Sequence, residues 1–253
     1  MRHRIERPPP WLTLFRWGLY FLNFTLYWTV IPSIRKRLGA SRSVIWSYSQ
    51  RASAIVLAIF GVRPHVEGLQ YLNPKRNYVV VCNHRSFFDQ VTLCVTFPRR
   101  LVMLSKQAYF DMPILGTALR CYEHLPVRRG AETGLSASSR ERLFQTLAED
   151  GCVLFYPEGT RAMSDEILPF KKGAFRYASE AGVDVIPIHL IGMNRIWTKE
   201  TSPLSIRGGP IRVVIAPPSS ISREQFEEES ERFEAEYRER HASLVREFAN
   251  GES

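Results

Sequence analysis

The chain has 253 residues, and 45% of them are hydrophobic, which allows a sizeable buried core and excludes wholesale disorder. Its four cysteines lie far apart without a CxxC pair, which disfavours a zinc knuckle or a disulfide scaffold and favours a reducing compartment. The net charge is +9, and residues 1–60 alone hold nine basic residues and one acidic residue. This segment is also aromatic, which favours an anionic membrane surface over a nucleic acid as its partner.

Two apolar segments make up the N-terminal part of the chain. Residues 17–34 hold no charge, and as a helix they would span about 27 Å, close to a hydrocarbon core of about 30 Å. Residues 44–62 have Gln50 and Arg51 at their centre, which makes a full crossing of a bilayer unfavourable. We therefore predict that residues 1–61 form two membrane-associating helices that dip into one leaflet. The basic cluster between them would lie at the lipid headgroups and consists of Arg35, Lys36 and Arg37.

Three other interpretations of this N-terminal part stay open. A single transmembrane span over residues 12–31 fits the hydropathy. A signal peptide fits the basic start and the apolar run, although residues 38–40 make a poor cleavage site. An ordinary pair of buried helices is the third possibility.

From residue 62 onwards, short β-branched runs alternate with segments of helical periodicity. The expected strands are Tyr78–Cys82, Leu101–Leu104, Cys152–Tyr156, Val183–Ile191 and Ile211–Ile215. The expected helices cover residues 87–97, 113–121, 138–149 and 172–181. This alternation predicts an α/β domain over residues 62–220, with a mostly parallel sheet flanked by helices. Residues 221–253, with ten acidic and five basic residues and widely spaced apolar positions, predict a charged amphipathic helix packed on that domain.

The first loop that holds candidate catalytic residues follows the strand that ends at Cys82. His84 leaves the strand end, and Asp89 comes five residues later, near the first turn of the next helix. A carboxylate that contacts one imidazole nitrogen fixes the tautomer and leaves the other nitrogen as a general base. A purely structural histidine at a strand end, or a nucleophilic pair of Cys82 and His84, would also fit this loop.

The second loop follows the strand that ends at Tyr156. Gly159 lets the backbone approach a ligand closely, and the guanidinium of Arg161 can bind a phosphate with two hydrogen bonds. Thr160 and the backbone N–H groups can add donors, and Lys171 at the start of the next helix favours an anion. A plain turn with a surface arginine would explain the loop equally well.

Taken together, the segments NHRSFFD and FYPEGTR, about seventy residues apart, resemble the glycerolipid acyltransferase family that carries the NHxxxxD motif. The 1-acyl-glycerol-3-phosphate acyltransferases are the most similar members. Further blocks of this resemblance lie at residues 106–116, 125–129 and 185–188, so that it covers residues 77 to about 191. The N-terminal helix pair is similar to that of the family's bacterial members.

The resemblance implies that His84, oriented by Asp89, deprotonates the hydroxyl of 1-acyl-glycerol-3-phosphate, which then attacks an acyl thioester to give phosphatidic acid. The thioester would be acyl-CoA or acyl carrier protein, and the family needs no metal and no cofactor. The residues that the resemblance places at the substrate are Asn83, Arg85, Lys106, Arg129, Glu158, Gly159, Thr160, Arg161 and Lys171. Lys106, Arg129 and Arg161 are candidates for the acceptor's phosphate, although Arg128 stands where the family commonly has an acid before Arg129.

Two functional alternatives stay open. The acceptor could be another lysolipid, such as a lysophospholipid or an amino-acid lipid, or the chain could be a non-catalytic lipid-binding protein of the same fold. The expected partners are membrane lipids and, where it is the acyl donor, acyl carrier protein, but no nucleic acid. The reduced cysteines and the soluble thioester donors favour the cytoplasmic face of a bacterial inner membrane.

Overall fold

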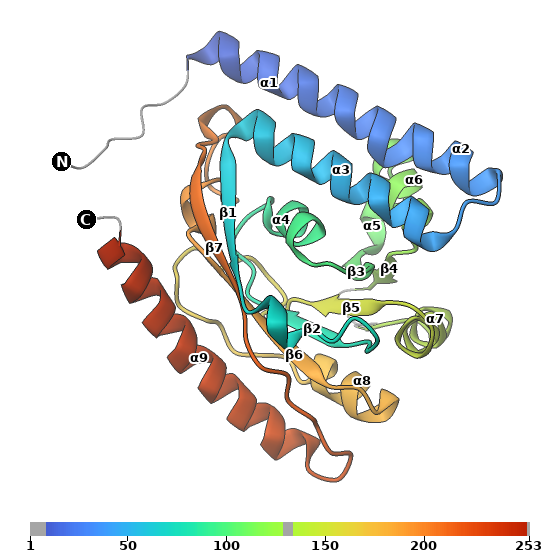
Figure 1. The fold of residues 1–253 in the computed structure, drawn as a ribbon, viewed down its shortest axis with the longest axis vertical. Helices are drawn as coiled ribbons and strands as arrows, with labels where there is room; N and C mark the ends of the chain where they lie inside the picture. Colours follow the sequence, from blue (N-terminus) through green and yellow to red (C-terminus); the bar gives the residue numbers. More distant parts are fainter. Residues whose placement is uncertain (1–8, 129–133, 252–253) are drawn as a thin grey trace.

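A seven-stranded sheet organises residues 9–128 and 134–251, which are the residues that the computed structural model describes (Figure 1). In spatial order the strands are β1 (Val62–Glu67), β7 (Gly209–Ile215), β6 (Val185–Ile191), β2 (Val79–Cys82), β5 (Cys152–Phe155), β3 (Leu101–Lys106) and β4 (Leu125–Val127). The run from β6 to β4 is parallel, whereas β7 lies antiparallel to β6 and carries β1 parallel to itself. The predicted α/β fold with a mostly parallel sheet is therefore confirmed. All five predicted strands are present, and β1 and β4 were not predicted.

Strand β2 shows why the sheet carries a helical layer on each face. Val80 and Cys82 belong to one hydrophobic core, and Val79 and Val81 belong to the other. All four side chains are fully buried. Successive side chains of a strand point to opposite faces, so a strand covered on both sides is apolar at every position.

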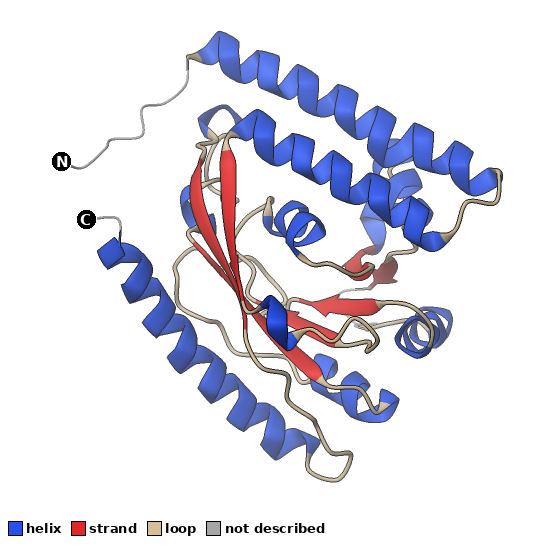
Figure 2. Ribbon diagram, viewed as in Figure 1, coloured by secondary structure: helices blue, strands red, loops and turns tan. Residues whose placement is uncertain are grey.

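Helices pack on both faces of the sheet (Figure 2). Helices α3 (Arg42–Phe60) and α4 (Asp89–Thr96) pack against the first core, and α7 (Ala137–Ala148), α8 (Gly173–Ala181) and α9 (Phe226–Gly251) pack against the second. The short helices α5 (Gln107–Phe110) and α6 (Pro113–Cys121) connect β3 to β4. Helix α9 occupies the segment for which a C-terminal amphipathic helix was predicted. The apolar and aromatic residues that it buries are Phe233, Tyr237, His241, Leu244 and Phe248.

The N-terminal segment forms a helical hairpin on the first layer. Its outer arm runs without a break through α1 (Pro10–Asn23), a π-helical stretch (Phe24–Val30) and α2 (Ile31–Arg37). The inner arm is α3, and its residues Trp46, Val56 and Phe60 are buried in the first core. Helix α3 ends next to the boundary predicted at residue 61. Its buried residues belong to the same hydrophobic core as the sheet, so the hairpin and the α/β domain pack together.

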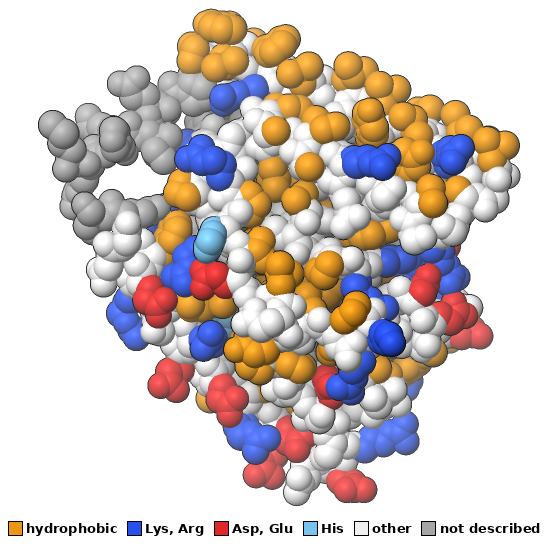
Figure 3. Space-filling model, viewed as in Figure 1, with side chains coloured by type: hydrophobic (Ala, Val, Ile, Leu, Met, Phe, Trp, Pro, Cys, Tyr) orange, Lys and Arg blue, Asp and Glu red, His pale blue; other side chains and the backbone are white. Residues whose placement is uncertain are grey.

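The outer arm of the hairpin presents an apolar surface, as Figure 3 shows along α1. Its most exposed apolar side chains are Trp11 (68%), Leu14 (63%), Phe15 (60%), Phe21 (61%) and Leu22 (57%). Among residues 9–128 and 134–251, no helix has both the length and the hydropathy required to cross a membrane.

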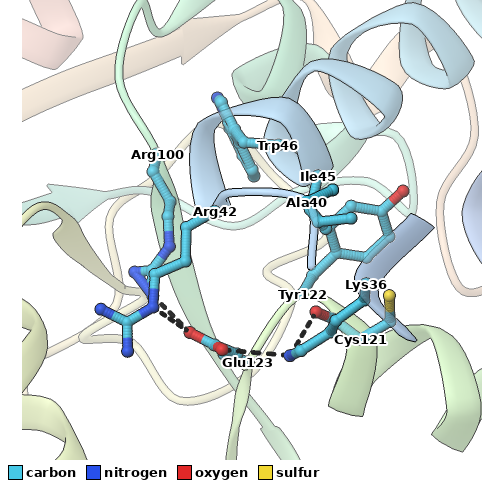
Figure 4. Close-up of a pocket in the computed structure, with 9 residues that line it drawn as sticks. All are labelled: Lys36, Ala40, Arg42, Ile45, Trp46, Arg100, Cys121, Tyr122 and Glu123. Atoms are coloured by element: carbon cyan, nitrogen blue, oxygen red, sulfur yellow. Dashed lines mark hydrogen bonds and ion pairs between the residues drawn. The ribbon is translucent and has the colours of Figure 1, made fainter. Parts of the chain in front are cut away.

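Glu123 ties the turn of the hairpin to the amino end of the sheet (Figure 4). Its carboxylate forms ion pairs with Lys36 at 3.0 Å, with Arg42 at 3.1 Å and with Arg100 at 2.8 Å. Burial alone would raise the pKa of Glu123, but the hydrogen bonds from Lys36 and Arg100 lower that pKa below its ordinary value. Lys36 of the predicted headgroup cluster thus makes an intramolecular ion pair, although its side chain is exposed.

Candidate active site

The predicted pair of His84 and Asp89 is brought together where β2 ends. The loop after Cys82 turns back so that Asp89 begins α4, and Oδ2 of Asp89 lies 2.7 Å from Nδ1 of His84. The Asp89 side chain is fully buried, whereas that of His84 is 19% exposed. One partner is therefore fixed inside the protein and the other reaches the surface.

Hydrogen bonds to Asp89 define the proton position on the imidazole. Its Oδ2 atom also accepts from the backbone N–H of Arg85 at 2.7 Å and of Ser86 at 2.9 Å. Two backbone N–H donors thus converge on this oxygen, so we assign it as the acceptor of the third contact as well and place the proton of the pair on Nδ1 of His84. The lone pair is then on Nε2, as a general base requires.

The ring of Tyr156 covers one face of the His84 imidazole. The two ring centroids are 4.0 Å apart and the ring planes make an angle of 16°. Tyr156 is the first residue after β5, the neighbour of β2 in the sheet. Burial raises the pKa of the Tyr156 phenol well above its ordinary value, so the hydroxyl stays protonated at neutral pH.

A buried ion pair joins the two loops. Nη1 of Arg85 donates to both carboxylate oxygens of Glu158, at 2.8 and 3.0 Å, and both side chains are almost fully buried. Glu158 also accepts the backbone N–H of His84 at 2.9 Å, while Nη2 of Arg85 donates to the carbonyl of Glu166. Arg85 and Glu158 were expected at the substrate, but they lie behind the loops and hold them together.

Asn83 has a similar internal role. Its side chain exchanges two hydrogen bonds with the backbone of Leu190 in β6, at 2.9 and 2.8 Å. Its backbone N–H and its Oδ1 both contact the hydroxyl of Tyr237 from α9. The residue is fully buried, so we revise the expected substrate contact to a bracing contact between β2, β6 and α9.

Arg161 lies beside the His84 loop, as the phosphate hypothesis requires. Its guanidinium carbon is 3.5 Å from the ring centroid of Phe87. On that loop Phe87 also stacks on Trp197, with a centroid distance of 4.3 Å. Trp197 in turn contacts Trp17 of α1 at 5.5 Å, so an aromatic chain links the N-terminal hairpin to Arg161.

Lys171 reaches the turn that contains Gly159. Gly159 has a φ of 69°, and a Cβ at this position would lie 2.9 Å from Cε of Lys171. The lysine side chain therefore lies across the turn. Thr160 is exposed on the same turn, and the backbone N–H of Ala162 donates to the carbonyl of His84.

Lys106 and Arg129, the two other residues expected at the acceptor's phosphate, are not placed beside His84 by any described contact. Lys106 ends β3, which is separated from β2 by β5, and its Nζ lies 5.9 Å from the ring centroid of Tyr109. It is exposed on the same carboxyl edge of the sheet as His84. Arg129 lies outside the described residues.

The alternative nucleophile does not fit its surroundings. Cys82 is fully buried, and burial raises the pKa of its thiol well above the ordinary value, so a reactive thiolate is disfavoured. Within the described part of the chain, no three His, Cys, Asp or Glu side chains form a group that could hold a metal ion.

Comparison with known proteins identifies the family. An acyltransferase family model matches residues 63–191, about half of the chain, and this range includes both loops. The chain belongs to the acyltransferase family. The chain is 33% identical over 155 residues to a chloroplastic 1-acyl-sn-glycerol-3-phosphate acyltransferase of Arabidopsis thaliana, covering 61% of this chain and 43% of the relative. It is also 33% identical over 167 residues to 1-acyl-sn-glycerol-3-phosphate acyltransferase alpha of Mus musculus, covering 64% and 56%.

The chain thus spans about half the length of these curated relatives. Its fold is similar to the crystal structure of the 1-acyl-sn-glycerophosphate acyltransferase of Thermotoga maritima, with a TM-score of 0.77 over 93% of this chain and 95% of that chain. The sequence identity is 20%, so this likeness shows a shared fold.

Sequence reasoning missed three aromatic residues of the site. Tyr156 was treated as part of a strand, although its place at the strand's carboxyl end was a usable signal. Trp197 and Tyr237 reach the site from segments far along the chain, and no local pattern marks them. Ser86 was quoted within the first motif without a role, and its hydroxyl donates to the carbonyl of Trp197 at 2.6 Å.

Proposed function

We propose that the chain transfers a fatty acyl group from a thioester to the free hydroxyl of 1-acyl-glycerol-3-phosphate, which gives phosphatidic acid. The observation that carries this proposal is the 2.7 Å contact between Nδ1 of His84 and Oδ2 of Asp89, with Arg161 stacked on the same loop. The relatives' names, which specify 1-acyl-sn-glycerol-3-phosphate acyltransferases, support the same substrate.

The reaction proceeds by general-base catalysis in one acyl-transfer step. Nε2 of His84 takes the proton of the acceptor hydroxyl as the oxygen attacks the thioester carbonyl, and Asp89 stabilises the imidazolium. The tetrahedral intermediate breaks its carbon–sulfur bond, and the departing thiolate takes the proton from His84 to leave as a thiol. A base and a positioned thioester suffice for this chemistry, so the proposal involves no metal and no cofactor.

Arg161 binds the acceptor's phosphate in this proposal. A guanidinium offers planar paired donors, and stacking on Phe87 restricts its orientation without using those donors. Lys171, which lies across the Gly159 turn, adds positive charge next to it. Lys106 stays a candidate further along the same edge of the sheet, and the predicted role of Arg129 is retained as a proposal.

The acyl donor is acyl-CoA or acyl carrier protein, and the enzyme works at a membrane surface. The exposed apolar face of α1 supports the membrane seat, since the acceptor is an amphiphile that already lies in a bilayer. Trp17 of α1 contacts Trp197 next to the His84 loop, so the seat and the site adjoin. The cytoplasmic face of a bacterial inner membrane is the proposed location.

An acceptor panel tests this function. Detergent-purified protein is given a radiolabelled acyl-CoA or acyl carrier protein with lysophosphatidic acid, a lysophospholipid or a lyso amino-acid lipid, and the lipid products are separated. Labelled phosphatidic acid as the dominant product supports the proposal. A dominant product from another acceptor would replace the substrate, and no labelled lipid with either donor would favour a lipid-binding protein without turnover.

A further inference from the structure

We infer that Tyr156 is a positioning residue for the general base, and that its ring rather than its hydroxyl performs this role. This inference rests on the proposed acyl transfer by His84. It extends the site to a residue that acts through the imidazole and does not itself contact the reacting atoms.

The contact between Tyr156 and His84 is nearly parallel and close. A centroid distance of 4.0 Å with an angle of 16° means that the phenol ring covers the imidazole face. The hydrogen bond to Asp89 fixes Nδ1, but a single hydrogen bond still lets the ring tilt about that contact. A flat neighbour removes this freedom, and it therefore fixes the direction of the Nε2 lone pair.

The backbone around Tyr156 holds its ring in place. β5 ends at Phe155 and pairs with β2 on one side and β3 on the other, so the start of the turn is anchored. The carbonyl of Tyr156 then accepts the backbone N–H of Gly159 at 2.9 Å, which closes the turn. Tyr156 also packs against the first hydrophobic core, which supports its side chain.

The stack also suits the charge that forms during the reaction. An imidazolium next to an aromatic face is stabilised by the negative face of the ring quadrupole, more strongly when the pair is partly desolvated. His84 is mostly buried, with a side chain 19% exposed. The Tyr156 ring therefore favours the protonated imidazole that follows proton uptake from the acceptor.

We do not assign the positioning role to the hydroxyl of Tyr156. It is buried and makes no hydrogen bond to any described residue. A buried hydroxyl without a partner destabilises the fold, so its loss should not harm stability. Tyr156→Phe keeps the ring and removes only this group, whereas Tyr156→Leu removes the ring face.

The test measures kcat and the acceptor's KM for the full chain in detergent. We expect Tyr156→Leu to lower kcat roughly 10- to 100-fold with little change in KM, and Tyr156→Phe to stay within about threefold of wild type. The matched control is Phe155→Leu, because Phe155 is adjacent on β5 and points to the opposite face, where it contacts Tyr177 at 5.9 Å. If circular dichroism shows that Tyr156→Leu is unfolded, Tyr156→Met replaces it, since methionine fills irregular space without a π face.

Each outcome has a distinct meaning. An active wild type with unchanged kcat in Tyr156→Leu would overturn the role of Tyr156 and leave the proposed function standing. An equal loss in Tyr156→Phe would assign the role to the hydroxyl and contradict the inference, as would an equal loss in Phe155→Leu. A wild type without acceptor-dependent transfer, using either thioester donor, would overturn the proposed function and this inference with it.

Discussion

In the proposed mechanism Asp89 orients the imidazole and stabilises the imidazolium, and Asp89→Asn separates these two effects. The asparagine oxygen can still accept from His84, Arg85 and Ser86, so we expect the fold to persist. The imidazolium loses its counter-charge, and kcat should fall by roughly 10²- to 10⁴-fold. Steady-state kinetics beside a thermal melt checks this expectation. A variant with more than a tenth of the wild-type kcat would mean that Asp89 is only structural.

Arg161 is expected to act on acceptor binding. Arg161→Ala removes charged hydrogen bonds to the phosphate, and the acceptor's KM should rise roughly 10- to 100-fold with a smaller change in kcat. An acceptor without a phosphate, such as a monoacylglycerol, provides the control because its turnover should not change. If the KM for lysophosphatidic acid also stays the same, another group holds the phosphate.

Glu123 connects two elements, the hairpin turn and the amino end of the sheet. Glu123→Gln leaves the mostly buried Arg100 with only its longer ion pair to Asp150, at 3.6 Å, and the free energy of unfolding should fall by about 1–3 kcal/mol at pH 7. Urea unfolding measures this change. Glu149→Gln is the matched control, because Glu149 also pairs with Arg42 but is exposed, so we expect little effect there.

The stabilisation by the Glu123 carboxylate should decrease as the pH falls. The pKa of Glu123 is lowered in the folded protein relative to its ordinary value of 4.5. The stabilisation is therefore fully present above pH 4.5 and is lost as the pH falls through the lower folded value. The difference between wild type and Glu123→Gln should shrink in acid, and a difference that grows would contradict this account.

At the level of elements, hydrophobic pattern predicted what is buried and regular. The apolar runs of β2, β5 and β6 were found because a strand buried on both faces is apolar at each position. β1 was missed because Pro64 and charged residues interrupt its sequence, which an edge strand tolerates. β4 was missed because three residues around Pro126 are too short to give a pattern.

The site was predictable only in its local part. The spacing of His84 and Asp89 brings both to one loop, and the structure places them in contact. The inward direction of Glu158 depends on Arg85 in the other loop, and the bracing of Asn83 depends on Tyr237, 154 residues away. Such long-range contacts follow from the packing of α9 and the sheet, which no local motif encodes.

For the whole molecule, the central question is how the site of the proposed acyl transfer reaches an acceptor that lies in a bilayer. The strongly exposed apolar residues of α1 lie on the outer arm of the hairpin, and Arg35 and Arg37 are exposed near its end. Such a surface favours insertion into an anionic leaflet. Because α3 is part of the core, the hairpin cannot be removed without exposing buried residues, so surface substitutions are the appropriate test.

We expect the double substitution Leu14→Glu and Phe15→Glu to reduce binding to anionic vesicles at least roughly tenfold, since each side chain would bury its apolar area in the leaflet. The melting temperature should change little because both residues are exposed. Leu69→Glu with Tyr71→Glu is the matched control, as these exposed residues lie away from α1 between β1 and β2. Equal binding by both double variants would place the membrane seat elsewhere.

The most direct test of the central claim is thiol release from long-chain acyl-CoA and from acyl carrier protein, with and without lysophosphatidic acid. It compares wild type, His84→Ala and His65→Ala, where His65 is an exposed histidine on β1. The account predicts acceptor-dependent release that falls at least roughly 100-fold in His84→Ala and persists in His65→Ala. Release by folded His84→Ala at a rate near that of wild type would contradict it.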